Sequence, residues 1–261
     1  MADSLSARGF YYDAVTEYYR FSFFHPGDDN LGNVYSKSAF CRAELGEWEE
    51  SLDDIDSAFS LVSNDSLKDH FQIDRAVILA ARGGLPTADS ILVTVDKKTE
   101  YPSIKSRIAD LRLLISVLRY DWRGAKEHIE GSSFDDSRTA AISGLLRETS
   151  EIEYKSPETA IMLSTLLPGA GQFYSGNFLS GLDAIALNGA LAYATGHLLI
   201  TERYGYAALT FYFGLRRYYE GNRHNAYEMA LEYNRILDKV MKDRLVEIMS
   251  NGAAANESAS R

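Results

Sequence analysis

RGFYYDAVTEYYRFSFFHP, residues 8–26, aligns without a gap with LGEWEESLDDIDSAFSLVS, residues 45–63, which begins 37 residues later in the chain. In each segment a glycine, Gly9 or Gly46, is followed two positions later by an aromatic residue. Small and apolar residues then recur at helical spacing. Such a glycine permits a tight turn between two helices, and small residues at facing positions let the helices approach closely. The alignment therefore predicts one helical hairpin per repeat and an all-α fold.

This pattern resembles a tetratricopeptide repeat. The residues that carry the resemblance are Tyr35, Ala39, Gly46, Trp48, Ser51, Ile55 and Ala58. The family usually has alanine where this chain has Ser51, and a closing proline where it has Ser63. The resemblance implies a solenoid of stacked helical hairpins whose concave face binds an extended peptide or a partner helix.

Weaker copies of the hairpin follow in the chain. One turn is expected at Gly83-Gly84-Leu85-Pro86, where two glycines end a helix and the proline starts the next. Another is expected at Asp121-Trp122, and residues 137–154 should form one more amphipathic helix. Roughly four degenerate hairpins would then occupy residues 2–155 as a tetratricopeptide-like solenoid.

The composition changes at Pro157. Residues 157–222 contain seven charged residues in 66, and between Glu158 and Glu202 the only charged residue is Asp183. Such a weakly charged segment is typical of a structure that contacts lipid or lies in a core. We therefore expect residues 156–222 to form a hydrophobic domain that is associated with a membrane.

A helical hairpin is the structure expected for this domain. Residues 178–201 would form a helix of about 36 Å, close to the roughly 30 Å hydrocarbon core of a bilayer plus part of its interface. Residues 204–219 would return antiparallel to it. The uncharged run of the return helix, residues 204–215, has a length more typical of a buried helix in a soluble protein. An alternative therefore stays open, in which residues 157–222 cap the solenoid of a water-soluble adaptor.

Several side chains of the hairpin are expected to pair across it. Asp183 and either Arg216 or Arg217 should lie at similar depth and form an ion pair, with the arginines reaching toward the interface. A stripe of residues at every fourth position should let the second helix approach closely, with Thr210 and Gly214 as its groove. The stripe consists of Ser180, Ala184, Asn188, Ala192 and Gly196.

A glycine-rich stretch, LLPGAGQFYSGNFLSGL (residues 166–182), precedes the hairpin. It lacks the lysine and hydroxyl residue of a phosphate loop and the third glycine of a dinucleotide-binding fingerprint. We expect Pro168 and Gly169 to break a helix, and Gly171 and Gly176 to adopt dihedral angles closed to other residues. Gln172 should hydrogen-bond to backbone groups that the break exposes.

The same stretch resembles the signature of bacterial envelope proteins in which degenerate tetratricopeptide repeats precede a hydrophobic domain. The matching motif, Pro-Gly-x-Gly-Gln-x-Tyr-x-Gly, consists of Pro168, Gly169, Gly171, Gln172, Tyr174 and Gly176. It is also distantly similar to the two-helix TM2 membrane module, through Phe173, Tyr174, Gly176 and Gly181. The acidic motif usual near the second span of TM2 proteins is missing. The resemblance implies membrane association in a bacterial cell envelope.

Composition excludes several classes of function. A net charge of −10 argues against nucleic acid as a partner, since phosphate binding needs a basic surface. A single cysteine, Cys41, excludes an internal disulfide and a cysteine-based zinc site. The five histidines are scattered and form no catalytic pattern, so we expect no enzyme, cofactor or metal. His197, in the apolar helix, could be a buried proton or metal group, although a satisfied interfacial histidine is the commoner case.

The sequence thus predicts a membrane-associated scaffold. The repeats would bind a protein or peptide, and residues 157–222 would contact lipid. Besides the soluble adaptor, a lipid or small-molecule site remains an alternative, and the candidate ligand or interface residues are Asp183, Asn188, His197, Arg216 and Arg217. Residues 223–250 should form an amphipathic helix and residues 251–261 a disordered tail.

The side of the membrane on which the repeats lie is open. The resemblance implies periplasmic repeats, provided that a leader has been removed from the chain. If instead Arg216, Arg217 and Arg223 follow the positive-inside tendency, both termini face the cytoplasm.

Overall fold

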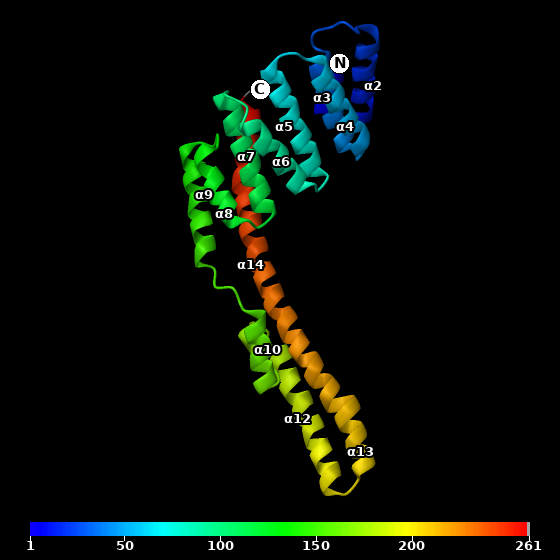
Figure 1. Ribbon diagram of the computed structural model, residues 1–261, viewed down its shortest axis with the longest axis vertical. Helices are drawn as coiled ribbons and strands as arrows, with labels where there is room; N and C mark the ends of the chain where they lie inside the picture. The colour runs from blue at the N-terminus through cyan, green and yellow to red at the C-terminus, as the bar shows by residue number, and fades with distance from the viewer. Residues whose placement is uncertain (260–261) are drawn as a thin grey trace. The chain divides into compact units, whose positions relative to one another are not determined.

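The computed structural model describes the backbone of residues 1–259 and the side chains of residues 1–250. Within the described residues every regular element is helical and no strand forms, as the sequence predicts (Figure 1). The chain divides into two compact units. Unit 1 comprises Met1–Leu146 with Leu245–Arg261, and unit 2 comprises Arg147–Arg244. The boundaries that the sequence predicts, at residues 155 and 222, differ from these.

Unit 1 consists of helices that pack against their neighbours in the sequence, and α3 and α7 also each contact α5. The helices are α1 (Ala2–Ala7), α2 (Tyr11–Phe24), α3 (Leu31–Glu44), α4 (Trp48–Leu61), α5 (Asp65–Ala81), α6 (Leu85–Asp96), α7 (Pro102–Leu118) and α8 (Trp122–His128). The short 3-10 helix η1 (Ile129–Gly131) and helix α9 (Asp136–Glu148) follow. The 3-10 helix η2 (Thr149–Glu151) ends the stretch that was expected to be one helix over 137–154.

The turns of unit 1 recur at a constant spacing. Gly9, Gly46 and Gly83 have φ of 80°, 79° and 98°, and Tyr120 has φ of 58°. Each lies 37 residues after the previous one, and two residues after each of them an even-numbered helix begins, from α2 to α8. The positive φ reverses the chain at the end of a helix, a conformation that costs glycine little and other residues more.

Packing positions recur at the same spacing. Five residues after each turn stands a small residue that is completely buried, namely Ala14, Ser51, Ala88 and Ala125. Nine residues after each turn stands a larger buried residue, namely Tyr18, Ile55, Leu92 and Ile129. Small residues let the paired helices approach, and the larger residues fill the space beside them.

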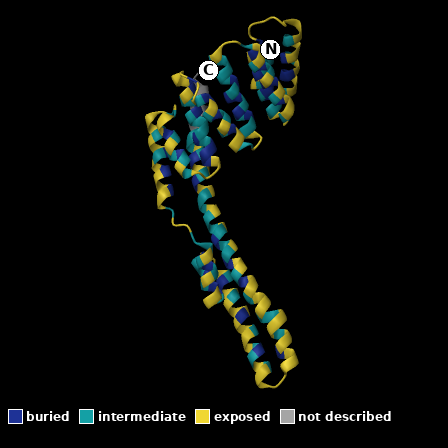
Figure 2. Ribbon diagram, viewed as in Figure 1, coloured by how far each residue is buried: buried dark blue, intermediate teal, exposed yellow. Residues whose placement is uncertain are grey.

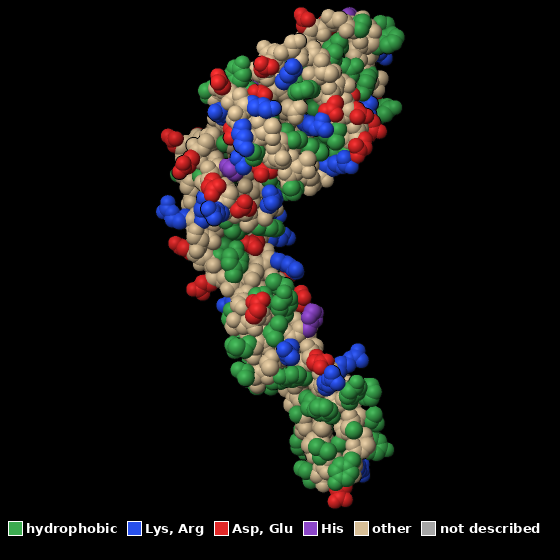
Figure 3. Space-filling model, in the orientation of Figure 1, with side chains coloured by type: hydrophobic (Ala, Val, Ile, Leu, Met, Phe, Trp, Pro, Cys, Tyr) green, Lys and Arg blue, Asp and Glu red, His purple; other side chains and the backbone are tan. Residues whose placement is uncertain are grey.

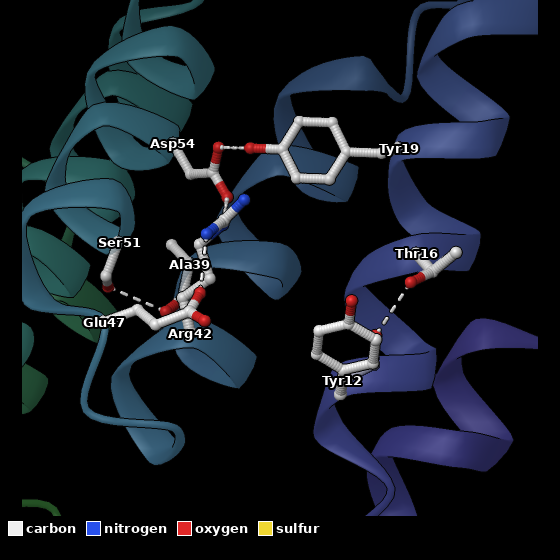
Figure 4. A network of polar contacts seen from close by, with 8 residues as sticks. All are labelled: Tyr12, Thr16, Tyr19, Ala39, Arg42, Glu47, Ser51 and Asp54. Atoms are coloured by element: carbon white, nitrogen blue, oxygen red, sulfur yellow. Dashed lines mark hydrogen bonds and ion pairs between the residues drawn. The ribbon is translucent and has the colours of Figure 1, made fainter.

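A polar network joins α2, α3 and α4 (Figure 4). The Tyr19 hydroxyl donates to the Asp54 carboxylate, and Arg42 donates to Asp54 over 3.2 Å and to Glu47 over 2.6 Å. The Arg42 guanidinium also lies 5.1 Å from the centre of the Tyr19 ring. Burial, together with the hydrogen bond to Asp54, raises the pKa of Tyr19 to about 12. Since Asp54 is buried, these partners compensate a charge that would otherwise be costly.

Unit 2 contains the predicted helical hairpin (Figure 1). Its elements are α10 (Pro157–Leu166), α11 (Ala170–Tyr174), α12 (Phe178–Ile200), α13 (Tyr204–Leu209), a π-helical segment η3 (Thr210–Leu215) and α14 (Arg216–Ala259). Helix α12 packs against α13 and η3, so the arms match the expected helices at 178–201 and 204–219.

Helix α14 has no end at residue 222. It continues through residues 223–250, which were expected to form a separate helix, and belongs to unit 2 up to Arg244 and to unit 1 from Leu245. The expectation of a disordered tail at 251–261 falls on residues whose side chains lie outside the description, and residues 260–261 lie outside it altogether. Within residues 1–259, none of the helices combines the length and the apolar character that crossing a membrane requires.

Candidate functional site

The glycines of the Pro-Gly-x-Gly-Gln-x-Tyr-x-Gly motif bring α11 and the turn before it into close contact with α10, α12 and α14. Gly169 has φ of 97°, and a Cβ atom there would overlap the carbonyl oxygen of Gly181. Gly171 does not have positive φ, contrary to expectation, and is needed for space instead. Its Cβ atom would overlap the carbonyl oxygen of Ala160 on α10 and lie 2.8 Å from Cβ of Ala226 on α14.

Gln172 is the polar centre of this contact and is 1% exposed. Its Nε2 donates to the backbone oxygen of Asn222 over 3.0 Å and also to the Asn222 side-chain oxygen. Its Oε1 accepts from the Ser164 hydroxyl over 3.0 Å, and that hydroxyl accepts from the Gly171 amide over 3.0 Å. The predicted role of Gln172 at the helix break is therefore wrong, because its partners lie on α10 and α14. The break is closed by the Ala170 amide, which donates to the Leu167 carbonyl over 3.0 Å.

The remaining motif residues also have structural roles. Pro168 follows the extended residue at which α10 ends, as expected before proline. The Tyr174 hydroxyl accepts from the Ser156 amide over 3.0 Å, and the Lys155 ammonium lies 5.0 Å from the Tyr174 ring centre. Gly176 has φ of 79° in the turn before α12. Thus the motif joins α10, α11, α12 and α14 into one unit.

The line of contact between the two arms of the hairpin, here called the hairpin seam, differs from the predicted stripe of small residues. The buried residues of α12 are Gly181, Asn188 and Thr195, which are seven residues apart. Across the seam, a Cβ atom on Gly214 would lie 3.0 Å from Leu191, whereas one on Gly196 would contact nothing. A four-residue step turns an α-helix by about 400°, so the predicted stripe drifts away from the partner by about 40° per step. A seven-residue repeat drifts much less.

The predicted ion pair across the hairpin does not form. Neither Arg216 nor Arg217 pairs with Asp183 within the described residues, and Arg216 instead pairs with Glu220 over 3.1 Å. Asp183 lies 19 residues before Glu202, whereas Arg217 lies only 15 residues after it. The difference of four residues corresponds to about 6 Å along the helix axis, too far for direct contact. By the same count, Asn222, 20 residues after Glu202, is closer in level to Asp183 than Arg217 is, and Asn188 is close in level to Arg217.

A pocket of about 740 Å³, here called the hairpin pocket, lies between α12 and α14. The polar side chains that line it include Gln172, Asp183, Asn188, Arg217 and Asn222. Leu187, Phe213 and Met229 contribute apolar walls. Three of the five candidate residues thus share one pocket with the motif glutamine. The other two do not line it: Arg216 pairs with Glu220, and His197 is exposed with its ring stacked on Tyr193 at 6.1 Å.

Two buried amides of the hairpin pocket have an atom without a hydrogen-bond partner. Asn188 Nδ2 donates to the Ala184 carbonyl over 2.8 Å, which leaves Oδ1 free. Asn222 Oδ1 accepts from Gln172, which leaves Nδ2 free. Both residues are 5% exposed. Asn222 was not among the predicted site residues, although its distance from the hairpin tip, nearly equal to that of Asp183, was a usable signal.

A second pocket, of about 870 Å³ and here called the unit 1 groove, is lined by residues of the first helices together with α5 and α7. Lys37 on α3 pairs with Asp3 over 2.8 Å, and Arg107 on α7 pairs with Asp74 on α5 over 2.8 Å. Hydrogen bonds from Lys37 and from Tyr18 hold the pKa of Asp3 below its usual range. The groove therefore combines paired cations and carboxylates with apolar side chains such as Phe21, Phe24 and Phe71.

Comparison of the chain with protein-family models, with curated proteins and with solved structures gives no match. In the part of the chain that the structure describes, no three histidine, cysteine, aspartate or glutamate residues are grouped so that they could hold a metal ion. Three features bear on the function of the chain: its all-helical architecture, the hairpin with its pocket, and the unit 1 groove.

Proposed function

We propose that this chain is a membrane-associated scaffold, in which the hairpin of unit 2 lies in the membrane interface and the helix pairs of unit 1 bind a protein or peptide. The exposed apolar surface of the hairpin is the observation that carries the proposal. Its exposed large side chains, between 38% and 83% exposed, are Leu182, Ile185, Tyr193, Leu199, Ile200, Tyr204, Tyr206, Leu209, Phe211, Tyr212 and Phe213. A patch of this size on a monomeric protein usually marks an interaction site.

The distribution of charge favours lipid as the cover for this surface. Apolar side chains dominate the hairpin, and charged side chains gather at its two ends (Figure 3). At the tip these are Glu202 and Arg203, and at the base Asp183, Arg216 and Arg217. Exposed residues predominate along both arms (Figure 2). Tyrosine, frequent here, suits an interface between water and hydrocarbon because its ring is apolar and its hydroxyl polar.

Helix α12 has two different sides. Leu182, Tyr193 and Ile200 are separated by 11 and 7 residues and therefore share one side of the helix. Asp183 and His197, separated by 14 residues, share another side. This asymmetry supports a hairpin that lies along the membrane surface, with the first side toward the acyl chains and the second toward headgroups and water.

The charged tip and the short return arm support the same orientation. The uncharged residues 204–215 measure at most about 18 Å, compared with a hydrocarbon core of about 30 Å. Vertical insertion to that depth would place Glu202 and Arg203 inside hydrocarbon, which is costly. A hairpin parallel to the surface keeps both of its charged ends among the headgroups.

Vesicle flotation with the full chain tests the membrane part of the proposal. The triple variant Leu182→Ser, Tyr193→Ser, Ile200→Ser should bind vesicles of phosphatidylcholine and phosphatidylglycerol more than tenfold more weakly than the wild type. Each side chain is more than half exposed, so the fold should persist, and each contributes about 1.5 kcal/mol or more when it leaves water. The matched control is Ala186→Ser, Ala190→Ser, Ala194→Ser on the same helix. Failure of the wild type to float, or equal loss in both variants, would refute the membrane role.

The scaffold part of the proposal includes a solenoid of tetratricopeptide type in unit 1. The constant 37-residue spacing of turns and buried small residues supports it, as does the packing of each helix from α1 to α8 on its sequence neighbours. The unit 1 groove, lined by residues of α1, α2, α3 and α5 and by Arg107 of α7, is a site on these helices where a peptide could lie. Paired charges that line this groove could exchange partners with an extended peptide.

Peptide display against the full chain tests the groove. Peptides selected on the wild type should lose at least tenfold in affinity for Asn33→Trp, because Asn33 is exposed and lines the groove. The control is Asp53→Trp, an equally bulky change at an exposed position of α4 that does not line the groove. Equal binding to both variants would place the peptide site elsewhere and reject the groove.

A further inference from the structure

The hairpin pocket has a fixed polarity, which follows from a chain of hydrogen bonds. The Gly171 amide donates to the Ser164 hydroxyl, the hydroxyl donates to Gln172 Oε1, and Gln172 Nε2 donates to Asn222 Oδ1. Each step fixes the direction of the next, so Asn222 has to leave its NH₂ group as the free end. On the other wall, donation to the Ala184 carbonyl leaves the Asn188 oxygen free.

Two side chains on each wall of the hairpin pocket share one chemical character, beside Ser180 on α12 and Tyr218 and Asn225 on α14, which can both donate and accept. On α12, Asp183 and Asn188 offer oxygen acceptors, and on α14, Arg217 and Asn222 offer N–H donors. In both pairs a charged residue precedes the amide by five residues. Neither Asp183 nor Arg217 forms an ion pair within the described residues, although both line the same pocket. Because the two arms are antiparallel, the carboxylate and the guanidinium lie diagonally across the pocket.

We propose that the hairpin pocket binds a small zwitterion that carries a primary ammonium and an anionic group, with phosphoethanolamine as the type ligand. The ammonium donates to the Asp183 carboxylate and the Asn188 oxygen. The anionic group accepts from the Arg217 guanidinium and the Asn222 amide. Such a ligand would give both orphaned atoms a hydrogen-bond partner and both charges an opposite charge at once.

The dimensions of the pocket fit this ligand. Five residues of helix place the charge of each wall about 7.5 Å along the axis from its own amide. The ammonium and the anionic group of the ligand lie a few ångströms apart. With a charge-assisted hydrogen bond of about 2.8 Å at each end, the ligand can bridge the diagonal between Asp183 and Arg217. Leu187 and Phe213 would contact the methylene groups between the charges. A volume of about 740 Å³ leaves room for the start of a lipid backbone.

Titration calorimetry of the full chain with O-phosphoethanolamine and with phosphocholine tests the proposal. Phosphoethanolamine should bind, and phosphocholine should bind at least tenfold more weakly because its quaternary ammonium has no N–H to donate. Asp183→Asn and Arg217→Gln should each weaken phosphoethanolamine binding at least tenfold. Both residues are exposed, so the variants should fold. Arg216→Gln is the matched control, since Arg216 is the neighbouring residue, pairs with Glu220 and does not line the pocket.

Flotation with and without phosphatidylethanolamine distinguishes a lipid headgroup from a free zwitterion. If the ligand is the headgroup, adding phosphatidylethanolamine to phosphatidylcholine vesicles should strengthen binding of the wild type but not of Asp183→Asn. Calorimetric binding without this vesicle effect would support a free zwitterion in the same pocket. Absence of phosphoethanolamine binding, or full binding by both pocket variants, would overturn the proposal. A chain that binds phosphoethanolamine but no vesicle would overturn only the membrane role.

Discussion

Gly171 shows, at the scale of a single residue, how closely the helices around the glycine motif are packed. Its would-be Cβ atom meets a backbone oxygen of α10 and a side chain of α14. Backbone cannot move aside as a flexible side chain can, so helix positions would have to shift. Gly189, on α12, is the opposite case, because a Cβ atom there would meet nothing within 4 Å.

This contrast gives a pair of predictions from the same chemical change. Gly171→Ala should lower the free energy of unfolding by about 3 kcal/mol through overpacking. Gly189→Ala should raise it by about 0.5–1 kcal/mol, because alanine is the better residue inside an exposed helix. Urea denaturation followed by circular dichroism measures both. Equal effects of the two substitutions would show that Gly171 is not tightly enclosed.

Part of the backbone structure of this region could be predicted from the residue types alone. The helix break at Pro168 and Gly169 and the positive φ of Gly176 were predicted from local backbone chemistry, whereas the positive φ of Gly169 was not. The space requirement of Gly171 and the partners of Gln172 depend on α14, some 50 residues further on. Local rules do not reveal which distant helix approaches, so these roles became visible only in the folded chain.

At the scale of elements, the turn before α8 departs from the other three. Tyr120 occupies the left-handed conformation that glycine occupies at the three equivalent turns. Left-handed backbone costs a residue with a side chain about 1 kcal/mol relative to glycine. The Tyr120 ring, which meets the Trp122 ring at 6.0 Å, offsets part of this cost.

Replacing this tyrosine should therefore stabilise unit 1. We expect Tyr120→Gly to raise the free energy of unfolding by about 0.5–1 kcal/mol, and Gly83→Ala to lower it by about 1 kcal/mol. Chemical denaturation of both variants measures the effect. A loss of stability in Tyr120→Gly would mean that the contacts of the tyrosine ring outweigh the backbone strain.

Helix α8 should also make stability depend on pH. Burial lowers the pKa of the His128 imidazole below its usual value of 6.5, and the nearby Arg112 guanidinium lowers it further. Above pH 6.5 the imidazole is neutral in the folded and the unfolded chain. As the pH falls below 6.5 the unfolded chain takes up a proton first, so the free energy of unfolding decreases until the folded pKa is passed.

Urea denaturation at pH 7.5 and pH 5.5 measures this dependence. The variant His128→Gln should lose less stability between the two values than the wild type does. An equal loss in both proteins would assign the dependence to other groups.

The hairpin seam illustrates what periodicity can and cannot predict for an element. Charge depletion correctly indicated a hairpin, the extent of its first arm and the start of its return arm, but not the end of the return arm, which continues past residue 219. The predicted stripe included Asn188 but also Ala192 and Gly196, which lie off the seam, because the period of four was read from residue size alone. Seven-residue spacing at Gly181, Asn188 and Thr195 is set by the supercoil of two packed helices, a property of the pair.

At the scale of the whole molecule, one helix serves both units. Ala230 on α14 is completely buried in unit 2, and Leu245 on the same helix is completely buried in unit 1. Composition suggested a boundary at residue 222, but composition records the end of the apolar surface and not the end of a helix. Helix α14 continues past residue 222 because its backbone hydrogen bonds continue there. The helix-forming residues beyond the boundary contribute to this.

Substitutions along α14 should therefore act on different units. Leu245→Ala should cost about 2–4 kcal/mol and lower hydrogen-exchange protection in unit 1, with α12 unaffected. Ala230→Gly should cost about 1 kcal/mol and lower protection in unit 2. Mass-spectrometric hydrogen exchange resolves the two regions. Loss of protection throughout the chain in both variants would show that the units unfold as one.

The nested order of the units has a consequence for synthesis on the ribosome. Unit 1 begins before unit 2 in the chain, yet part of unit 1, from Leu245 onward, is made only after all of unit 2 has been translated. At an elongation rate of about 5–20 residues per second, translation of unit 2, Arg147–Arg244, takes roughly 5–20 s. Throughout that interval the nascent chain carries an apolar hairpin beside a helical assembly that still lacks one piece. Chaperone capture should therefore peak in that window and fall once the last segment emerges.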